Sequence, residues 1–181
     1  MDAIELLKNR RSVRKYKNEK VDRQTMEEII DVARFAPSWA NFQVARYTLV
    51  ENDEIIAKIA DSGMSNFAYN INTLRGAKGV AVLSYVKGKS GTLGDSGYAT
   101  NKANSWEVFD AGIACQTFCL AAFAKGVGTC IFGIFDDAAL SKIINLPEDE
   151  TVAAVIVYGY TEGTPAVASR KEVAEIARFI D

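Results

Sequence analysis

Two long apolar runs restrict the fold of this chain more than any other feature. They read GVAVLSYV at residues 79–86 and TVAAVIVYGY at residues 151–160. Neither run alternates between apolar and polar residues, which is typical of strands that are buried on both faces. Such strands need a layer of helices on each side. The sequence therefore predicts an α+β fold in which helices cover both faces of a central sheet.

Local signals place the other elements around these strands. Asp2 and Glu5 form the pattern of a capping box at the start of a short helix over Ala3–Lys8. A long apolar helix is expected over Ser105–Lys125. Three more helices are expected: one capped by Asp22 that ends before Pro37, one over Asp53–Ala60 and one after Asp136. Two further strands are expected over Arg46–Val50 and Thr129–Phe132. Near the C-terminus, the sequence predicts a helical stripe of Val173, Ile176, Ala177 and Ile180. Residues 1–181 contain no repeat or linker and are expected to form one domain.

Positive charge is concentrated near the N-terminus. Residues 8–20 hold seven of the 21 Lys and Arg residues, whereas the whole chain has a net charge of −2. That balance, with an isoelectric point near 5.3, argues against general nucleic-acid binding. Several roles remain open for this segment. It could bind a phosphate, a nucleic acid or a membrane surface locally, or it could be a plain solvated face.

The chain has no histidine and three cysteines. The missing histidine excludes Ser-His-Asp and Cys-His catalysis and most transition-metal sites, so no metal is expected. Cys115, Cys119 and Cys130 lie in apolar surroundings and are predicted to be reduced core thiols. If the protein is an enzyme, a cofactor is the obvious source of its chemistry.

Two segments bear on where the protein is located in the cell and on how a ligand would reach its site. The apolar stretch 108–124 is interrupted by polar residues and falls short of the roughly 20 apolar residues of a membrane span. No signal peptide is visible, so a soluble cytoplasmic protein is expected. Residues Lys87–Asn104 are rich in Gly and Ser and predict a long flexible loop, which is typical of a lid or binding loop.

Five ordered pieces carry a resemblance to a known family. They are RRSVR at residues 10–14, APSWANFQ at 36–43, Asn70, the stretch from Trp106 to Gly133, and Arg170-Lys171. In this order they resemble the FMN-dependent nitroreductases over nearly the whole chain. The resemblance implies a mixed sheet between helix layers and a homodimer whose FMN sites lie at the interface and are built by both chains. It also implies ping-pong transfer from NADH or NADPH through FMN to a small flat acceptor, such as a nitroaromatic or a quinone.

The resemblance assigns cofactor-binding roles by position. Arg10, Arg11, Ser12 and Arg14 match the residues near the phosphate, ribityl chain and flavin edge, and Arg170 with Lys171 would complete the phosphate clamp. The chemistry agrees, because a guanidinium fork donates bidentate hydrogen bonds to phosphate. The other matching positions are Pro37, Ser38, Asn41, Gln43, Asn70, and the backbone of Gly133 or Ile134, which would face the flavin.

Two positions depart from the family pattern. Val44 follows Gln43 where Pro is common, and Thr73 stands where some relatives place a Lys that binds the phosphate of the nicotinamide cofactor. The choice between NADH and NADPH therefore stays open. So do three alternatives to a general reductase: a relative with narrower flavin chemistry (reductive dehalogenation or flavin breakdown), a non-catalytic flavin or nucleotide binder, and a nucleic-acid module.

Overall fold

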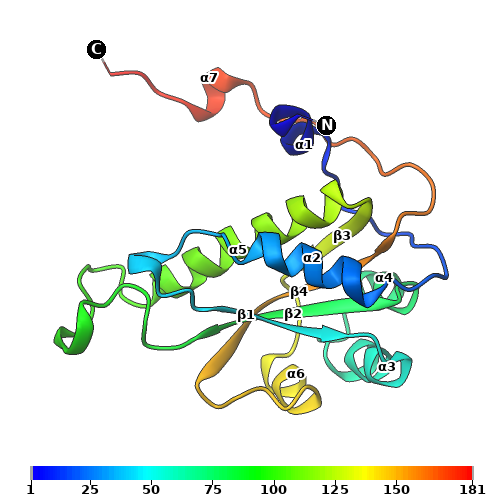
Figure 1. The fold of residues 1–181 in the computed structure, drawn as a ribbon, viewed down its shortest axis with the longest axis horizontal. Coiled ribbons are helices and arrows are strands. Elements are labelled where there is room, and N and C mark those ends of the chain that lie inside the picture. The colour runs from blue at the N-terminus through cyan, green and yellow to red at the C-terminus, as the bar shows by residue number, and fades with distance from the viewer. Residues whose placement is uncertain (1, 181) are drawn as a thin grey trace.

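The structure is a computed structural model that describes residues 2–180, with residue 95 described by its backbone alone. Its centre is a four-stranded sheet, drawn in Figure 1. The strands are β1 (Ala45–Val50), β2 (Gly79–Val86), β3 (Val127–Phe132) and β4 (Glu150–Tyr160), in the spatial order β1-β2-β4-β3. The two apolar runs thus form buried strands, as predicted from the sequence, and these are the two central strands of the sheet.

All neighbouring strands of this sheet are antiparallel. The parallel component expected of a mixed sheet is confined to one bridge, in which Ser12 pairs with Thr129 at the outer edge of β3. The α+β class with helices on both faces is confirmed. The reason is visible along β2, where Val80 and Val82 pack into one cluster while Ala81 and Leu83 pack into the other.

The two helix layers differ in composition. One face carries α2 (Arg23–Ala33) and the 20-residue α5 (Ser105–Ala124), which lie above the sheet in Figure 1. The other face carries α3 (Asp53–Ser62), α4 (Ala68–Arg75) and α6 (Asp137–Ile143). Each layer buries an apolar stripe against the sheet, which is how both faces of β2 and β4 come to be covered.

Helix α5 is long and apolar enough to cross a membrane by length and composition alone, yet half of its apolar window is buried inside the protein. Its buried positions include Phe118 and Cys119, which pack over the sheet. The three cysteines are free and buried, as predicted. Two acidic residues of the same helix, Glu107 and Asp110, are also buried.

The predicted caps are confirmed. Asp22 accepts a hydrogen bond from the backbone N–H of Thr25, and Asp136 accepts one from that of Ala139, both at 2.9 Å. Asp2 and Glu5 form the capping box of α1 (Ala3–Asn9). Helix α4 was not anticipated, because its sequence, AYNINTLR, has a weak apolar stripe. Its packing against α3 stabilises it instead.

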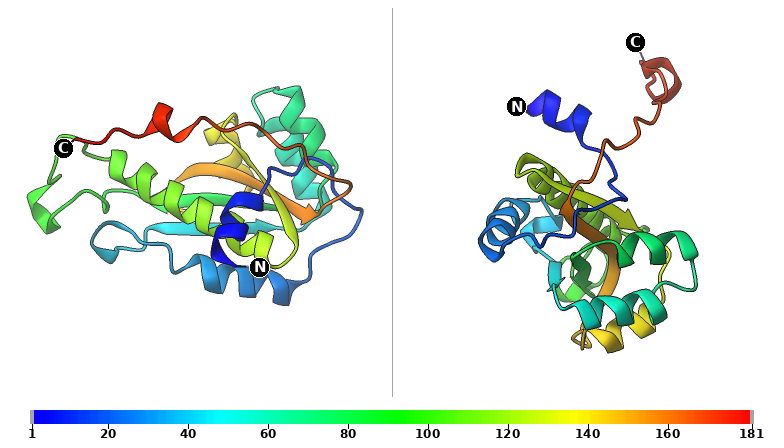
Figure 2. Two further views of the ribbon diagram at one scale, coloured as in Figure 1. Left: turned by 90° about the horizontal axis from the view of Figure 1, so that it is seen from above. Right: turned by 90° about the vertical axis from the view of Figure 1, so that its right-hand side faces the viewer.

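The C-terminal tail contradicts the sequence expectation. Only Val173–Ile176 is helical (α7), and the rest of residues 166–180 is extended and exposed. The right-hand view of Figure 2 shows this tail leaving the layered body. An isolated helix of this length is unstable without a packing partner, and residues 2–180 offer none to the apolar stripe. The exposed apolar side chains of the tail are Val167, Val173, Ile176, Phe179 and Ile180.

The start of β2 provides a sensitive test of the packing. A Cβ added at Gly79 would lie 2.2 Å from a ring carbon of Tyr158, which is only 1% exposed. We expect Gly79→Ala to lower the free energy of unfolding by about 1–3 kcal/mol, because the buried ring has to shift. Gly76→Ala is the control, since its nearest neighbours are at 3.6 and 3.8 Å. Urea denaturation of both variants measures the difference, and equal effects would contradict the close packing.

Candidate functional site

The N-terminal arginines form the first half of the candidate site, which we call the arginine cluster (Arg10, Ser12, Arg14, Asn70, Ile134). Residues 10–14 follow α1 as an extended segment along the edge of β3. The backbone N–H of Val13 donates to the carbonyl of Thr129 at 2.8 Å, and Val13 is buried. Ser12 and Arg14 flank it on the more accessible side. Ser12 and Arg14 therefore share one side of this extended segment, opposite the buried Val13.

Arg10 carries an unusual feature. Its Nε atom is buried and has no hydrogen-bond partner. Burying an N–H donor without an acceptor is costly, so such groups in native proteins call for an explanation. A ligand with negatively charged oxygens would provide the missing acceptor. Arg11 differs, because its Nη1 donates to the carbonyl groups of Lys8 at 2.5 Å and Arg10 at 2.9 Å and so covers the end of α1.

Helix α4 brings a second element to the arginine cluster. Asn70 is 6% exposed, and its Nδ2 donates to the carbonyl of Ile134 at 3.2 Å. The guanidinium of Arg14 lies over the ring of Tyr69, 5.7 Å from its centroid, in a cation–π contact. Ile134 itself is half exposed, and a Cβ added at the preceding Gly133 would meet no atom within 4 Å. Three predicted positions from distant parts of the chain thus meet here.

The positive charge of Arg10 acts to lower the pKa of the three buried thiols behind the cluster. A hydrogen bond from Cys115 lowers the pKa of the Cys119 thiol, and Thr129 and Arg10 act in the same direction against burial. The same Cys115–Cys119 bond, together with burial, raises the pKa of Cys115. Burial raises the pKa of Cys130, although Arg14 and Arg10 oppose it. Both guanidinium groups therefore act on Cys130, which lies within β3.

The second half of the candidate site is the loop of residues 37–43, which contains the short 3-10 helix η1 (Trp39–Asn41). Ala40, Asn41 and Gln43 all have positive φ, at 44°, 56° and 50°. Residues other than glycine rarely adopt this conformation, and such strain concentrates at functional sites. The Ser38 hydroxyl accepts a hydrogen bond from the Gln43 backbone N–H at 2.8 Å. We call this segment the strained loop.

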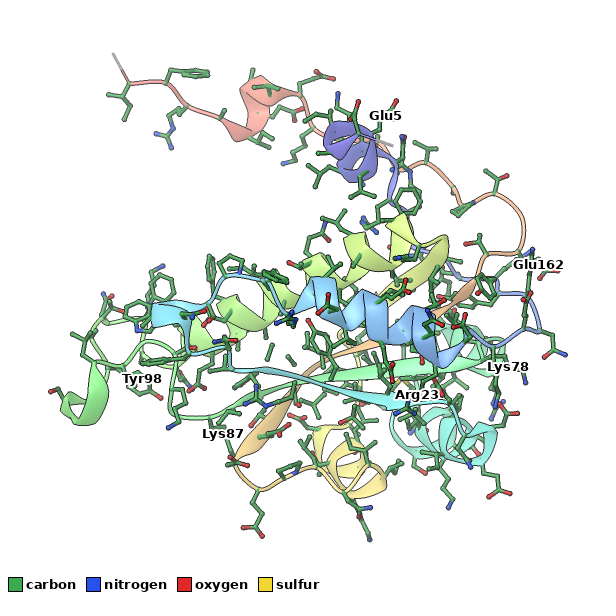
Figure 3. All side chains as sticks on the ribbon, in the orientation of Figure 1. Glu5, Arg23, Lys78, Lys87, Tyr98 and Glu162 are labelled. Carbon is green, nitrogen blue, oxygen red and sulfur yellow. The ribbon has the colours of Figure 1, made fainter. Side chains whose placement is uncertain are left out.

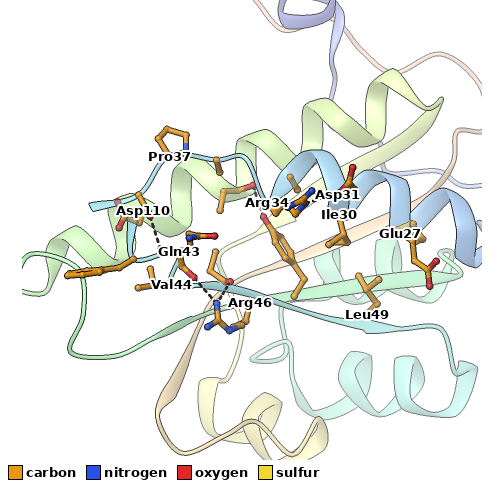
Figure 4. Close-up of a pocket in the computed structure, with 18 of the residues that line it drawn as sticks. Glu27, Ile30, Asp31, Arg34, Pro37, Gln43, Val44, Arg46, Leu49 and Asp110 are labelled. Atoms are coloured by element: carbon orange, nitrogen blue, oxygen red, sulfur yellow. Dashed lines mark hydrogen bonds and ion pairs between the residues drawn. The ribbon is translucent and has the colours of Figure 1, made fainter. Parts of the chain in front are cut away.

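A groove of about 790 Å³ borders the strained loop, between α2 and the edge strand β1 (Figure 4). Pro37, Ser38 and Gln43 line one end of it. Its floor is apolar, and charged residues ring its mouth. The floor comprises Met26, Ile30, Ala33, Val44, Tyr47 and Leu49, and the charged residues are Arg23, Glu27, Asp31, Arg34 and Arg46.

The two halves do not meet within one chain. The strained loop contacts α5 at Asp110, whereas the arginine cluster lies near Cys119, nine residues along the same helix, or about 14 Å at 1.5 Å per residue. No hydrogen bond joins them within residues 2–180. Arg170 and Lys171 lie in the exposed tail, where Arg170 donates to the carbonyls of Ala168 and Ser169. The structure brings neither of them to the arginine cluster.

The loop Lys87–Asn104 is more ordered than its composition predicts. It contains a 3-10 turn, η2 (Gly94–Ser96), and a bridge between Thr92 and Tyr98. Lys87 and Tyr98 are labelled in Figure 3, where the loop extends beyond the N-terminal end of α5. Leu93 and Tyr98 near its tip are exposed, whereas Ser90 at its base is fully buried. Buried contacts therefore fix the base of this loop.

Comparison with known proteins decides the family. The model of the Nitroreductase family matches residues 7–160. This chain belongs to the nitroreductase family. A Methanothermobacter thermautotrophicus protein provisionally named NADH dehydrogenase/NAD(P)H nitroreductase is 27% identical over 169 residues, covering 91% of this chain and 80% of that protein.

Solved structures agree with the fold of this nitroreductase-family chain. A nitroreductase family protein from Streptococcus pneumoniae has a TM-score of 0.85 at 19% identity and covers 98% of this chain and 100% of its own. A protein from Clostridium difficile described as an FMN-dependent nitroreductase has a TM-score of 0.77 at 23% identity, with 97% and 98% covered. At these identities the likeness establishes the fold.

The structure gives physical reasons for the two departures from the nitroreductase pattern. Val44 is 1% exposed, and its carbonyl accepts a hydrogen bond from the N–H of Val86, so it extends the pairing of β1 with β2. Thr73 is 7% exposed, and its hydroxyl donates to the carbonyl of Tyr69 within α4. In this family member, Thr73 is therefore a structural residue of its helix.

Sequence reasoning missed three residues around this candidate site. Tyr69 supports Arg14, and the buried acids Glu107 and Asp110 hold the loops beside the N-terminal half of α5. A signal for the acids was present, because acidic residues on an otherwise apolar helix are rarely buried without partners. Their partners lie in two separate loops, which no local pattern identifies.

Proposed function

We propose that this protein is an FMN-dependent oxidoreductase that passes reducing equivalents from NADH or NADPH to a small flat acceptor such as a nitroaromatic or a quinone. The observation that carries the proposal is the unpartnered, buried Nε of Arg10 beside Ser12 and Arg14, in a chain of the nitroreductase family. The descriptions of the relatives, an NAD(P)H nitroreductase and an FMN-dependent nitroreductase, support the same reading.

The residues present fit FMN. Arg10, Ser12 and Arg14 would hold its phosphate and ribityl chain, with Asn70 and the backbone of Gly133 and Ile134 near its ring. Ser38, Asn41 and Gln43 offer neutral donors and acceptors for the polar edge of the ring. When bound, FMN supplies the electron-transfer chemistry, which this chain's own side chains lack. The protein's part is to grip the phosphate, orient the ring and leave one face open.

A homodimer is part of this proposal. The arginine cluster and the strained loop lie apart in one chain, so a site that uses both takes one half from each of two copies. The apolar tail and the groove beside β1 both lack a partner within residues 2–180. A second copy that receives the tail would cover both surfaces. We also propose a soluble protein that acts in the cytoplasm.

The cofactor proposal has a direct test. The purified protein should be yellow, and denaturation should release FMN, identified by chromatography. FMN is expected because the clamp contains one cluster of phosphate-binding arginines and the sequence lacks a dinucleotide-binding glycine motif. Apoprotein should regain its flavin absorbance when FMN is added. Release of FAD alone, or failure to take up any flavin, would reject the proposal.

Activity is tested by NADH and NADPH oxidation with a nitroaromatic or a quinone as acceptor. One open site used in turn by both substrates predicts parallel lines in double-reciprocal plots. Intersecting lines would mean two separate sites. Flavin binding without turnover would favour a non-catalytic flavin binder. Turnover restricted to a halogenated aromatic or to flavin itself would favour the narrower flavin chemistries of related enzymes.

A further inference from the structure

One buried carboxylate joins the two loops that flank α5. Asp110 is 4% exposed, and its Oδ2 accepts hydrogen bonds from the Trp39 backbone N–H at 2.9 Å and from the Ser90 hydroxyl at 2.6 Å. Trp39 begins the strained part of the 37–43 loop, and Ser90 is at the base of the 87–104 loop, where it is fully buried. We call these three residues the Asp110 latch (Trp39, Ser90, Asp110).

Further contacts strengthen the junction around the latch. The Trp39 indole N–H donates to the Thr92 carbonyl at 2.9 Å, which adds a second link between the loops. The rings of Trp39 and Trp106 lie 4.9 Å apart, and the Trp106 indole N–H donates to the Thr100 hydroxyl at 2.9 Å. Glu107, one helical turn before Asp110, accepts a hydrogen bond from the Gly88 N–H. The base of the 87–104 loop is thus attached at several points.

We propose that Asp110 is a positioning residue that keeps the two loops in one fixed arrangement. Bonds to a carboxylate are stronger than bonds between neutral groups, and they are hard to replace in a buried site. The latch maintains the positive φ angles that follow Trp39, which the local sequence would not adopt alone. It also fixes the base of the 87–104 loop, so that only the tip around Leu93 and Tyr98 moves to admit an acceptor.

This inference rests on the proposed function, because the strained loop is assigned there to the flavin. The latch makes two separable contributions. The bond to Trp39 serves the flavin-contacting loop, and the bond to Ser90 serves the loop that controls acceptor access. Ser90→Ala removes one of these bonds and Asp110→Ala removes both, so the two variants have different expected effects, which a residue of purely structural importance would not produce.

The test uses three variants of the full-length holoprotein: Ser90→Ala, Asp110→Asn and Asp110→Ala. Ser84→Ala is the matched control, because Ser84 is also fully buried and its hydroxyl donates to a carboxylate, that of Glu150, at 2.5 Å. Two readouts need neither flavin nor turnover. Near-ultraviolet circular dichroism reports the coupling of the chain's two tryptophans, Trp39 and Trp106. Tryptic cleavage after Lys89 and Lys102 reports opening of the 87–104 loop.

Ser90→Ala is expected to raise the cleavage rate and the acceptor KM about tenfold, while the FMN dissociation constant changes less than about twofold. Asp110→Ala is expected to lose the tryptophan coupling signal as well, and to weaken FMN binding about tenfold. Asp110→Asn keeps an acceptor oxygen without its charge and should lie between wild type and Asp110→Ala. Ser84→Ala should leave all these readouts near wild type, although it lowers stability.

A wild-type dichroism spectrum and cleavage rate in Asp110→Ala would overturn the proposal, as would equal changes in Ser84→Ala. If Asp110→Ala does not fold, Ser90→Ala and Asp110→Asn decide by the same criteria. Failure of the proposed function gives a different pattern. In that case the wild-type protein itself would bind no FMN, while the dichroism and cleavage readouts would still distinguish the latch variants from the control.

Discussion

Removing residues 167–181 is expected to convert the proposed dimer, of twice 19.7 kDa, into a monomer. The exposed Val173, Ile176 and Phe179 would each contribute about 1.5–3 kcal/mol if a second copy buried them. Their loss should therefore raise the dimer dissociation constant more than a hundredfold. Light scattering coupled to size exclusion, at micromolar protein, measures the mass. FMN affinity should fall with the dimer, because each site would lose one of its halves.

A second variant separates apolar packing from charge. Changing Val173, Ile176 and Phe179 together to Ser leaves Arg170 and Lys171 in place and should also give a monomer. Arg170→Ala should keep the dimer and weaken only FMN binding. The body of the protein should still fold in the truncated chain, since the hydrogen bonds of residues 168–177 stay within the tail. A truncated protein that remains dimeric with its flavin would contradict the shared site.

Changing Arg10 to Ala should weaken FMN binding roughly tenfold to a hundredfold, the equivalent of a lost charged hydrogen bond of about 1.5–3 kcal/mol. The apoprotein should not be destabilised, because the lost Nε–H is a buried donor without a partner. The gain in melting temperature on adding FMN should shrink instead. Flavin titration and thermal unfolding, each with and without FMN, measure both effects.

Lys17 is the control for this prediction. It belongs to the same basic segment, but its side chain is exposed, and its backbone N–H alone is engaged, with the Tyr160 carbonyl. Lys17→Ala should leave FMN affinity near wild type, since an exposed charge contributes little. Arg14→Ala should resemble Arg10→Ala in FMN binding. Equal losses in Lys17→Ala and Arg10→Ala would mean that the segment acts through diffuse charge, without a specific clamp.

Much of the fold followed from local patterns. The runs at 79–86 and 151–160 had to be buried on both faces, which required helix layers on each side of the sheet. Asp22 and Asp136 marked helix starts because a cap bonds to a backbone group three residues away. The Arg-x-Ser-x-Arg segment was compatible with phosphate binding because a guanidinium fork suits phosphate, but only the resemblance to the nitroreductases assigned it to FMN.

Tertiary structure decided what depends on partners far along the chain. Helix α4 exists because α3 packs against it, and the tail is not a full helix because nothing in the described part of the chain covers its apolar stripe. Asp110 was visible only as a polar residue on an apolar helix, yet its partners lie 71 and 20 residues away. Likewise, the buried Nε of Arg10 and the separation of the two halves of the site depend on how the chain packs in three dimensions. Sequence periodicity records which face of an element is buried, whereas the choice of the opposing residue depends on contacts that form only when the chain has folded.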